Sequence, residues 1–290
     1  MILQAIALAL SAAALHATWN VRLKAAGDPL SVATRATVAS AVSVAPLGCL
    51  IWLLTGRPGI PAGVWGLVVL SAMGELAYYI FLSAGYRRAE ISHIYPVARG
   101  TAPVLAVLAG LGLGERLQWA GYLGVVLVLA GLLAIRPPRG AGSATIFAVL
   151  TGVCIAWYST VDSIGVQHVQ PWLYGWAIWT GAALFATAWV CGANWRRRRQ
   201  AGNSSSRNAE DAQHRSWRAA LAMGTLMALP YLLVLQALSW APLMVVAPVR
   251  ESAIVLVTVW SVLRLGERDR VGWRLGGAAA VVAGIALLAV

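Results

Sequence analysis

Ionisable side chains stand inside several long apolar stretches of this sequence, where charge is costly. They are three arginines and three carboxylates: Arg35, Arg99, Arg250, Glu75, Asp162 and Glu251. Placing one such group at a helix centre in a bilayer costs about 2.5–3.5 kcal/mol on insertion scales, so it needs a partner or a watery cavity. A planar guanidinium suits carboxylate-like and phosphate-like groups. The set therefore predicts either recognition of an anionic small molecule or a closed network of salt bridges between helices.

Depth within the apolar stretches separates the six charges. At about 1.5 Å per residue, four lie close to the middle of their stretch: Glu75, Arg99, Arg250 and Glu251. Arg35 and Asp162 lie nearer an end, and the long stem of Arg35 can reach the headgroups. We predict that Arg99 and Arg250 bind an anionic group, while Glu75 and Glu251 either neutralise these arginines or receive an ammonium. A carboxylate without a partner in a dry cavity can also take up a proton.

Polar and aromatic side chains share helical faces with these charges through i, i+3 and i+4 spacing. We predict that they complete the site: His16, Trp19, Asn20, Tyr79, Tyr158, Asp162 and Tyr231. Two alternatives stay open, since Trp19 can belong to an interfacial aromatic belt and His16 can be a hydrogen-bonded packing residue.

Metal, cofactor and enzyme chemistry have no support in the sequence. The three cysteines have no C-x-x-C spacing, and neither H-E-x-x-H nor G-x-S-x-G occurs. We therefore expect no metal, no cofactor and no catalytic residues.

The elements that carry these residues are apolar runs long enough to cross a bilayer. Of 290 residues, 60% are hydrophobic and 11% charged, with a mean hydropathy of +0.74, whereas roughly a quarter of the residues of soluble proteins are charged. A spanning helix needs about 20 apolar residues. We predict an all-α polytopic membrane protein with ten spans, at residues 2–21, 30–54, 61–85, 91–113, 117–135, 144–167, 171–194, 218–239, 242–263 and 271–290. The short turns between most of them predict that consecutive helices are antiparallel neighbours.

The net charge of +12 resides in the loops, which argues against a nucleic-acid surface. Seventeen Lys and Arg residues follow odd-numbered spans, while only Arg57 and Arg116 follow even-numbered ones. The positive-inside rule then places both termini outside the cytoplasm and the polar loop 196–217 inside it.

An internal repeat runs through the chain. At a shift of 152 residues, the segment 79–116 matches 231–268 at ten of 38 positions. We predict two five-helix repeats, 1–137 and 138–290. Because five is an odd number, the second repeat enters the membrane from the opposite side and is inverted relative to the first. The shift matches Pro96 with Pro248, where we expect bends or breaks, and places Arg99 opposite Glu251 as its expected partner.

Several motifs carry a family resemblance: His16-Ala17-Thr18-Trp19-Asn20, Tyr95-Pro96-x-x-Arg99-Gly100, Ala247-Pro248-Val249-Arg250-Glu251, and Gly-Glu-Arg at 114–116 and 266–268. With them the sequence resembles the drug/metabolite transporter superfamily, specifically its EamA-type members with two five-helix repeats. The resemblance implies transport of small metabolites, often export, through a cavity between the halves, and it adds Tyr95 to the expected site. We expect Glu115 and Glu267 in the two turns to cap helices or to pair with Arg116 and Arg268.

We therefore predict a secondary transporter in the cytoplasmic (inner) membrane that moves a small polar metabolite, such as an amino acid, zwitterion or organic anion. Its partners are the lipid bilayer, the substrate and protons, with Glu75 as the candidate for proton exchange. The alternatives from other classes are an intramembrane enzyme and a membrane scaffold or sensor without transport activity.

Overall fold

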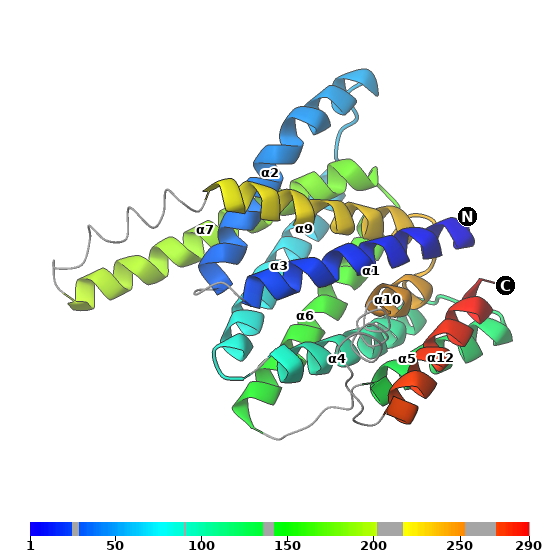
Figure 1. Ribbon diagram of the computed structural model, residues 1–290. Helices are drawn as coiled ribbons and strands as arrows, with labels where there is room; N and C mark the ends of the chain where they lie inside the picture. Colours follow the sequence, from blue (N-terminus) through cyan, green and yellow to red (C-terminus); the bar gives the residue numbers. More distant parts are fainter. Residues whose placement is uncertain (25–28, 90, 136–141, 202–216, 253–270, 290) are drawn as a thin grey trace.

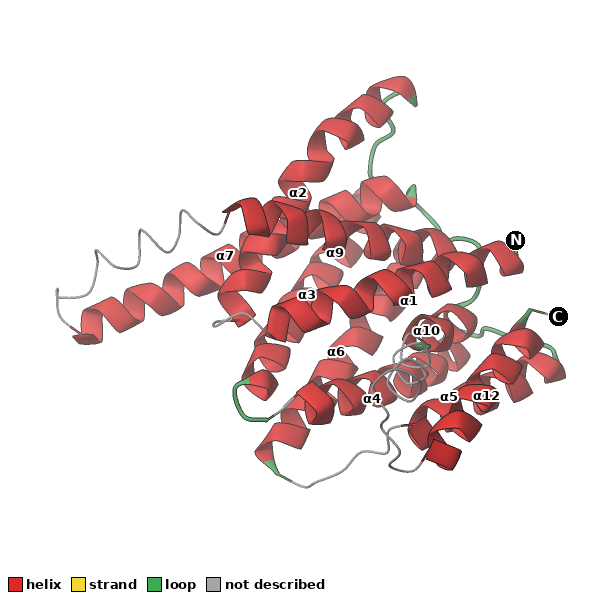
Figure 2. Cartoon of the chain, in the orientation of Figure 1, coloured by secondary structure: helices red, strands yellow, loops and turns green. Residues whose placement is uncertain are grey.

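The computed structural model describes residues 1–24, 29–89, 91–135, 142–201, 217–252 and 271–289, and this part of the chain is helical with short connections (Figures 1 and 2). The first half contains α1 (Ile2–Lys24), α2 (Pro29–Leu54), the 3-10 turn η1 (Ala62–Val64), α3 (Trp65–Tyr86), α4 (Ile91–Gly112) and α5 (Trp119–Ile135). The second half contains α6 (Ser143–Gly165), α7 (Pro171–Ala201), α9 (Trp217–Leu238), α10 (Leu243–Glu251) and α12 (Val271–Leu288). Each predicted span thus corresponds to one α-helix, and the ninth is described only as far as Ser252.

Length and hydropathy make this a multi-pass membrane protein. Five of the described helical stretches are long and apolar enough to cross a bilayer: Pro29–Leu54, Ala62–Tyr86, Ser143–Gly165, Pro171–Trp195 and Val271–Leu288. Others contribute shorter apolar segments, including Val97–Gly112 and Trp119–Ala134. Large apolar side chains such as Leu108, Ile146 and Val282 face outward, as expected where lipid replaces water.

Helices pack mainly against helices of the other half. Figure 1 shows α1 beside α9 and α5 beside α12. The contact of α1 with α9 has a counterpart in that of α6 with α3, and the contact of α2 with α9 has one in that of α7 with α3. The pairs α2 with α7, α4 with α10 and α5 with α12 each join corresponding helices. This pattern is that of two repeats related by a pseudo-twofold axis. The prediction that consecutive helices are the main packing neighbours is corrected, because consecutive helices contact each other less than they contact helices of the opposite repeat.

Glycines allow α5 and α12 to approach closely. A Cβ atom at Gly124 would lie 2.8 Å from the carbonyl oxygen of Gly284, and one at Gly131 would lie 2.5 Å from that of Gly277. Any side chain at these positions would push the two backbones apart, so the absence of a Cβ is what permits this small-residue contact between the repeats.

The Gly-Glu-Arg turn that follows α4 is a Schellman cap. Gly114 has a φ of +82°, the Gly114 N–H donates to the Leu111 carbonyl at 3.0 Å, and the Glu115 N–H donates to the Gly110 carbonyl at 3.0 Å. Glycine takes this left-handed conformation without the steric cost of a Cβ. The turn therefore fixes the direction in which the Glu115 side chain leaves α4.

The Glu115 carboxylate caps a helix of the opposite repeat. Its Oε1 accepts the Leu243 N–H at 2.7 Å and its Oε2 accepts the Met244 N–H at 2.9 Å, at the first two residues of α10. Negative charge at a helix N-terminus is favourable, so this cap, called the Glu115 clasp below, joins the two halves. The cap was expected, but its target in the other repeat was not. Glu267 lies outside the described residues.

Candidate functional site

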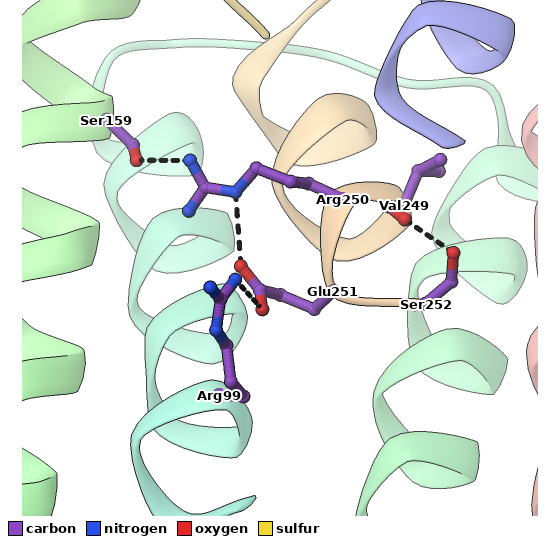
Figure 3. Close-up of polar contacts among 6 residues, drawn as sticks. All are labelled: Arg99, Ser159, Val249, Arg250, Glu251 and Ser252. Carbon is purple, nitrogen blue, oxygen red and sulfur yellow. Dashed lines mark hydrogen bonds and ion pairs between the residues drawn. The ribbon is translucent and has the colours of Figure 1, made fainter. Parts of the chain in front are cut away.

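A triad of buried charges joins the two repeats. Arg99 on α4 donates from Nη1 to Glu251 Oε2 at 2.5 Å, and Arg250 donates from Nε to Glu251 Oε1 at 3.1 Å. Figure 3 shows the Glu251 carboxylate lying between the two guanidinium groups. Arg99 and Arg250 are each 8% exposed and Glu251 is 3% exposed. We call Arg99, Arg250 and Glu251 the arginine–glutamate triad.

Other side chains fix the orientation of both arginines. Arg250 Nη1 also donates to Ser159 Oγ on α6 at 3.3 Å, while the Arg99 guanidinium lies 5.2 Å from the ring centroid of Tyr95, within the range of a cation–π interaction. With one carboxylate between two guanidiniums, the triad carries one net positive charge. That charge lies at the contact of α4 and α10, and an anionic group bound there would neutralise it.

The end of α10 places Arg250 and Glu251. Pro248 lies within this helix, and α10 ends at Glu251, three residues later. Ser252 closes the turn, with its N–H donating to the Val249 carbonyl at 3.1 Å and its hydroxyl donating to the same oxygen at 2.7 Å (Figure 3). In the first repeat, α4 runs through Pro96 as one helix, so a helix end follows only the second of the two matched prolines.

Beside the triad lies a small cavity of about 40 Å³. We call it the tyrosine-lined cavity, and its walls are His16, Glu75, Tyr78, Tyr79, Tyr158, Trp179, Met227 and Tyr231. These residues come from α1, α3, α6, α7 and α9, so both repeats build it. Tyr158 connects it to the triad, because the next residue, Ser159, binds Arg250 and both arginines lie close enough to interact electrostatically with Tyr158.

One buried acid lines this cavity, and a second lies behind its wall. Glu75 is 5% exposed and lines it. Asp162 is 1% exposed, and it accepts hydrogen bonds from the Ser71 hydroxyl at 2.6 Å and the Tyr231 hydroxyl at 2.7 Å. The two carboxyl groups are near enough for their charges to interact. The cavity therefore combines an acidic lining with aromatic surfaces.

Aromatic rings form a continuous chain along the cavity. The ring centroids of Tyr79 and Tyr78 lie 5.1 Å apart, those of Tyr78 and Tyr158 lie 6.2 Å apart, and those of Tyr158 and Tyr231 lie 6.4 Å apart. Trp179 extends the chain at 5.6 Å from Tyr231. The hydroxyl of Tyr79 donates to the sulfur of Met227 at 3.3 Å. These contacts link aromatic side chains of α3, α6, α7 and α9.

Comparison with known proteins decides the family. The profile described as "EamA-like transporter family" matches two segments, residues 3–136 and 142–290, which together span nearly the whole chain. The chain belongs to the EamA-like transporter family. The resemblance seen in the sequence motifs is confirmed. The proteins of this family are membrane transporters, not enzymes.

Solved structures share the fold of this chain. Twenty-one chains match, and one of them, a crystal structure titled only as that of a protein, covers 99% of this chain and 98% of its own length, with a TM-score of 0.69 and 20% identity. At that identity the likeness concerns the fold alone. No curated protein matches the sequence.

Most of the predicted site residues of this EamA-like chain come together. The expected partnership of Arg99 with Glu251 is confirmed by their ion pair, and Arg250 pairs with Glu251 as well. Five predicted residues line the cavity: His16, Glu75, Tyr79, Tyr158 and Tyr231. Asp162 and Tyr95 contact residues of the cavity and the triad. Trp19 and Asn20 belong to α1, and their side chains fall outside the described part.

The prediction of a closed set of salt bridges holds for three of the four central charges. Glu75 forms no ion pair among the described residues, and Arg250 bonds to Glu251 and Ser159 instead. Sequence reasoning missed Tyr78, Trp179, Ser71 and Ser159. Ser71 could have been predicted from the sequence, because it precedes Glu75 by one helical turn and lies on the same helix face.

Proposed function

We propose that this EamA-family chain is a secondary transporter that exports a small polar metabolite across the cytoplasmic membrane by alternating access. The metabolite carries an acidic group, as amino acids, other zwitterions and organic anions do. The moving bodies are the two repeats, residues 1–137 and 138–290. Family membership supports transport, and the buried triad at the contact of the repeats supports the substrate class.

The net positive charge of the triad is the observation that carries this proposal. Removing one partner of a buried ion pair costs about 3–5 kcal/mol, because a charge is left without compensation. Moving α4 away from α10 separates Arg99 from Glu251, so this free-energy cost opposes the movement. A substrate carboxylate bound between the arginines offsets it, so the repeats can separate when substrate is bound. Movement and substrate binding are thereby coupled.

The tyrosine-lined cavity must widen for a substrate to enter. A cavity of about 40 Å³ holds only a few water-sized groups, given roughly 10–15 Å³ for one water-sized probe. The geometry described here therefore corresponds to a closed form of the site. Opening toward either face requires the cross-repeat helix contacts to shift.

Protons supply the driving force in this proposal, with Glu75 as the exchanging group. Its Oε2 is buried without a hydrogen-bond partner among the described residues. The groups facing it are His16 on α1, Tyr79 on α3, Asp162 on α6 and Tyr231 on α9. A proton on Glu75 removes one negative charge from this lining, which changes how the cavity receives a charged substrate.

Reconstitution into proteoliposomes tests the proposal. Vesicles loaded with unlabelled amino acids and organic acids should accumulate the ¹⁴C-labelled compounds by counterflow, whereas an enzyme or a scaffold gives no vesicle-retained label. Arg99→Lys and Arg250→Lys should lower the rate by about 10- to 100-fold, because each loses a charge-assisted hydrogen bond worth about 1.5–3 kcal/mol.

The matched control is Arg87→Lys, a change at an exposed arginine beyond the end of α3, which should leave the rate unchanged. Near-parental counterflow by both lysine variants of the triad would show that these arginines serve the fold alone.

A further inference from the structure

The Glu75 side chain is a buried acceptor aimed into a cavity. Oε2 of Glu75 has no hydrogen-bond partner among the described residues, although the residue is only 5% exposed and lies in the middle of α3. Buried polar atoms in proteins are satisfied in the great majority of cases. An orphaned carboxylate oxygen on a cavity wall is therefore an acceptor that a donor of an incoming ligand can satisfy.

Tyr231 and Asp162 add a second polar element to the same wall. The Tyr231 hydroxyl donates its proton to Asp162 Oδ2 at 2.7 Å, while Ser71 donates to Oδ1 at 2.6 Å. The Tyr231 hydroxyl group also lies within hydrogen-bond range of the Glu75 carboxyl group. Because its one proton is donated to Asp162, its oxygen has lone pairs for a further donor. The wall thus offers acceptors from both Glu75 and Tyr231.

The aromatic lining selects the sign of the ligand charge. Tyr78, Tyr79, Tyr158, Tyr231 and Trp179 line the cavity, and aromatic rings attract cations to their faces through their quadrupole. An anion here would meet the Glu75 carboxylate, with Asp162 behind Tyr231, and several aromatic rings, which disfavours it. A metal ion is a poor fit, because the described residues hold no cluster of three or more His, Cys, Asp or Glu side chains.

We propose that the tyrosine-lined cavity binds a substrate's ammonium group, with Glu75 as its counter-ion and the Tyr231 oxygen as a second acceptor. This inference rests on the proposed transport function, and it narrows the substrate to a zwitterion. The carboxylate binds at the arginine–glutamate triad and the ammonium at Glu75.

The spacing along α6 fits a small molecule that carries both charges. Ser159, which bonds to the triad, and Asp162, which bonds to the cavity wall, are three residues apart on α6, or about 4.5 Å along its axis at 1.5 Å per residue. The two charged ends of an amino acid are separated by a few bonds. The volume of about 40 Å³ accommodates a primary ammonium, which is close to water in size, more readily than a trimethylammonium.

The test compares three probes in one set of proteoliposomes: a mixture of ¹⁴C-labelled amino acids, ¹⁴C-propionate, which lacks the ammonium, and ¹⁴C-glycine betaine, which carries three methyl groups on it. The parent protein should favour the amino acids over both other probes. Glu75→Gln should lower the ratio of amino-acid to propionate counterflow by about 10- to 100-fold, the range expected for the loss of a hydrogen bond to a charged group. Tyr231→Phe, which keeps the ring, should lower the same ratio less.

Because the readout is a ratio within the same vesicles, a variant that folds poorly does not distort it. A parent protein that carries propionate as fast as amino acids, or a Glu75→Gln protein with the parental ratio, overturns the ammonium site while leaving transport established. Absence of counterflow with every probe would instead refute the transport function, and the ammonium site with it.

Discussion

The Glu115 clasp offers the sharpest test of how the repeats are held together. In Glu115→Gln, the single amide oxygen can still accept one backbone N–H of α10. The amide NH₂ group takes the place of the second oxygen, so the other backbone N–H loses its acceptor and faces a donor. Losing a helix N-cap costs about 0.5–2 kcal/mol, and losing the negative charge there costs about 0.3–1 kcal/mol more. We expect a loss of about 1–3 kcal/mol, because both hydrogen bonds are short, at 2.7 and 2.9 Å.

Thermal unfolding in detergent, followed by tryptophan fluorescence at a fixed scan rate, measures this loss. At about 2 °C per kcal/mol for a chain of this size, the apparent melting temperature should fall by about 2–6 °C. Arg116→Gln is the matched control, because Arg116 is the exposed neighbour of Glu115 and its loss should shift the transition by less than about 1 °C.

Gly110 supplies an independent route to the same contact. A Cβ atom there would lie 2.5 Å from Glu115 Oε2 and 2.6 Å from Met244 Cγ, so Gly110→Ala displaces the carboxylate from α10. If both variants break one clasp, the double variant should lose little more than the worse single one. A Glu115→Gln protein that melts with the parent, or single effects that simply add, would refute the reasoning.

Three further outcomes are expected. The seventeen-to-two charge asymmetry of the loops places the C-terminus outside the cytoplasm, so a reporter enzyme that works only there should be active when fused after Val290. Activity of a reporter that works only in the cytoplasm would refute this topology. An imposed pH gradient should accelerate amino-acid accumulation by the parent protein, whereas the residual transport of Glu75→Gln should not respond; an equal response in both proteins removes Glu75 from coupling. Gly131→Val should destabilise the contact of α5 with α12 by about 1–3 kcal/mol, measured as a lower melting temperature than that of Gly112→Val, where a Cβ meets no neighbour within 4 Å.

The helices and one central contact of the site were predictable from sequence because both depend on regularities of the chain. Apolar run length sets the spans, and the repeat shift of 152 residues pairs Arg99 with Glu251, as observed. The side-chain direction of Arg250 was not predictable in this way. Neighbouring residues diverge by about 100° on a helix, but the long arginine stem bends back at the end of α10 and reaches Glu251.

Contacts between the repeats account for most of what the sequence left open. Neither Tyr78 nor Trp179 differs from an ordinary membrane-helix aromatic until α3 and α7 are packed together. Asp162 was placed near a helix end by counting residues, yet its partners Ser71 and Tyr231 come from helices far away in sequence. Such pairings depend on which helices of the two halves meet, and hydropathy carries no information about that choice.

The ion pair between Arg99 and Glu251 also bears on how the chain arose. These residues occupy corresponding positions of the two repeats. Two identical ancestral subunits would have placed the same residue at both positions, and two arginines or two glutamates at that buried contact would repel each other. Opposite charges at this contact therefore require two repeats of different sequence. We therefore expect the halves, expressed as separate polypeptides 1–137 and 138–290, to assemble with each other and not with themselves.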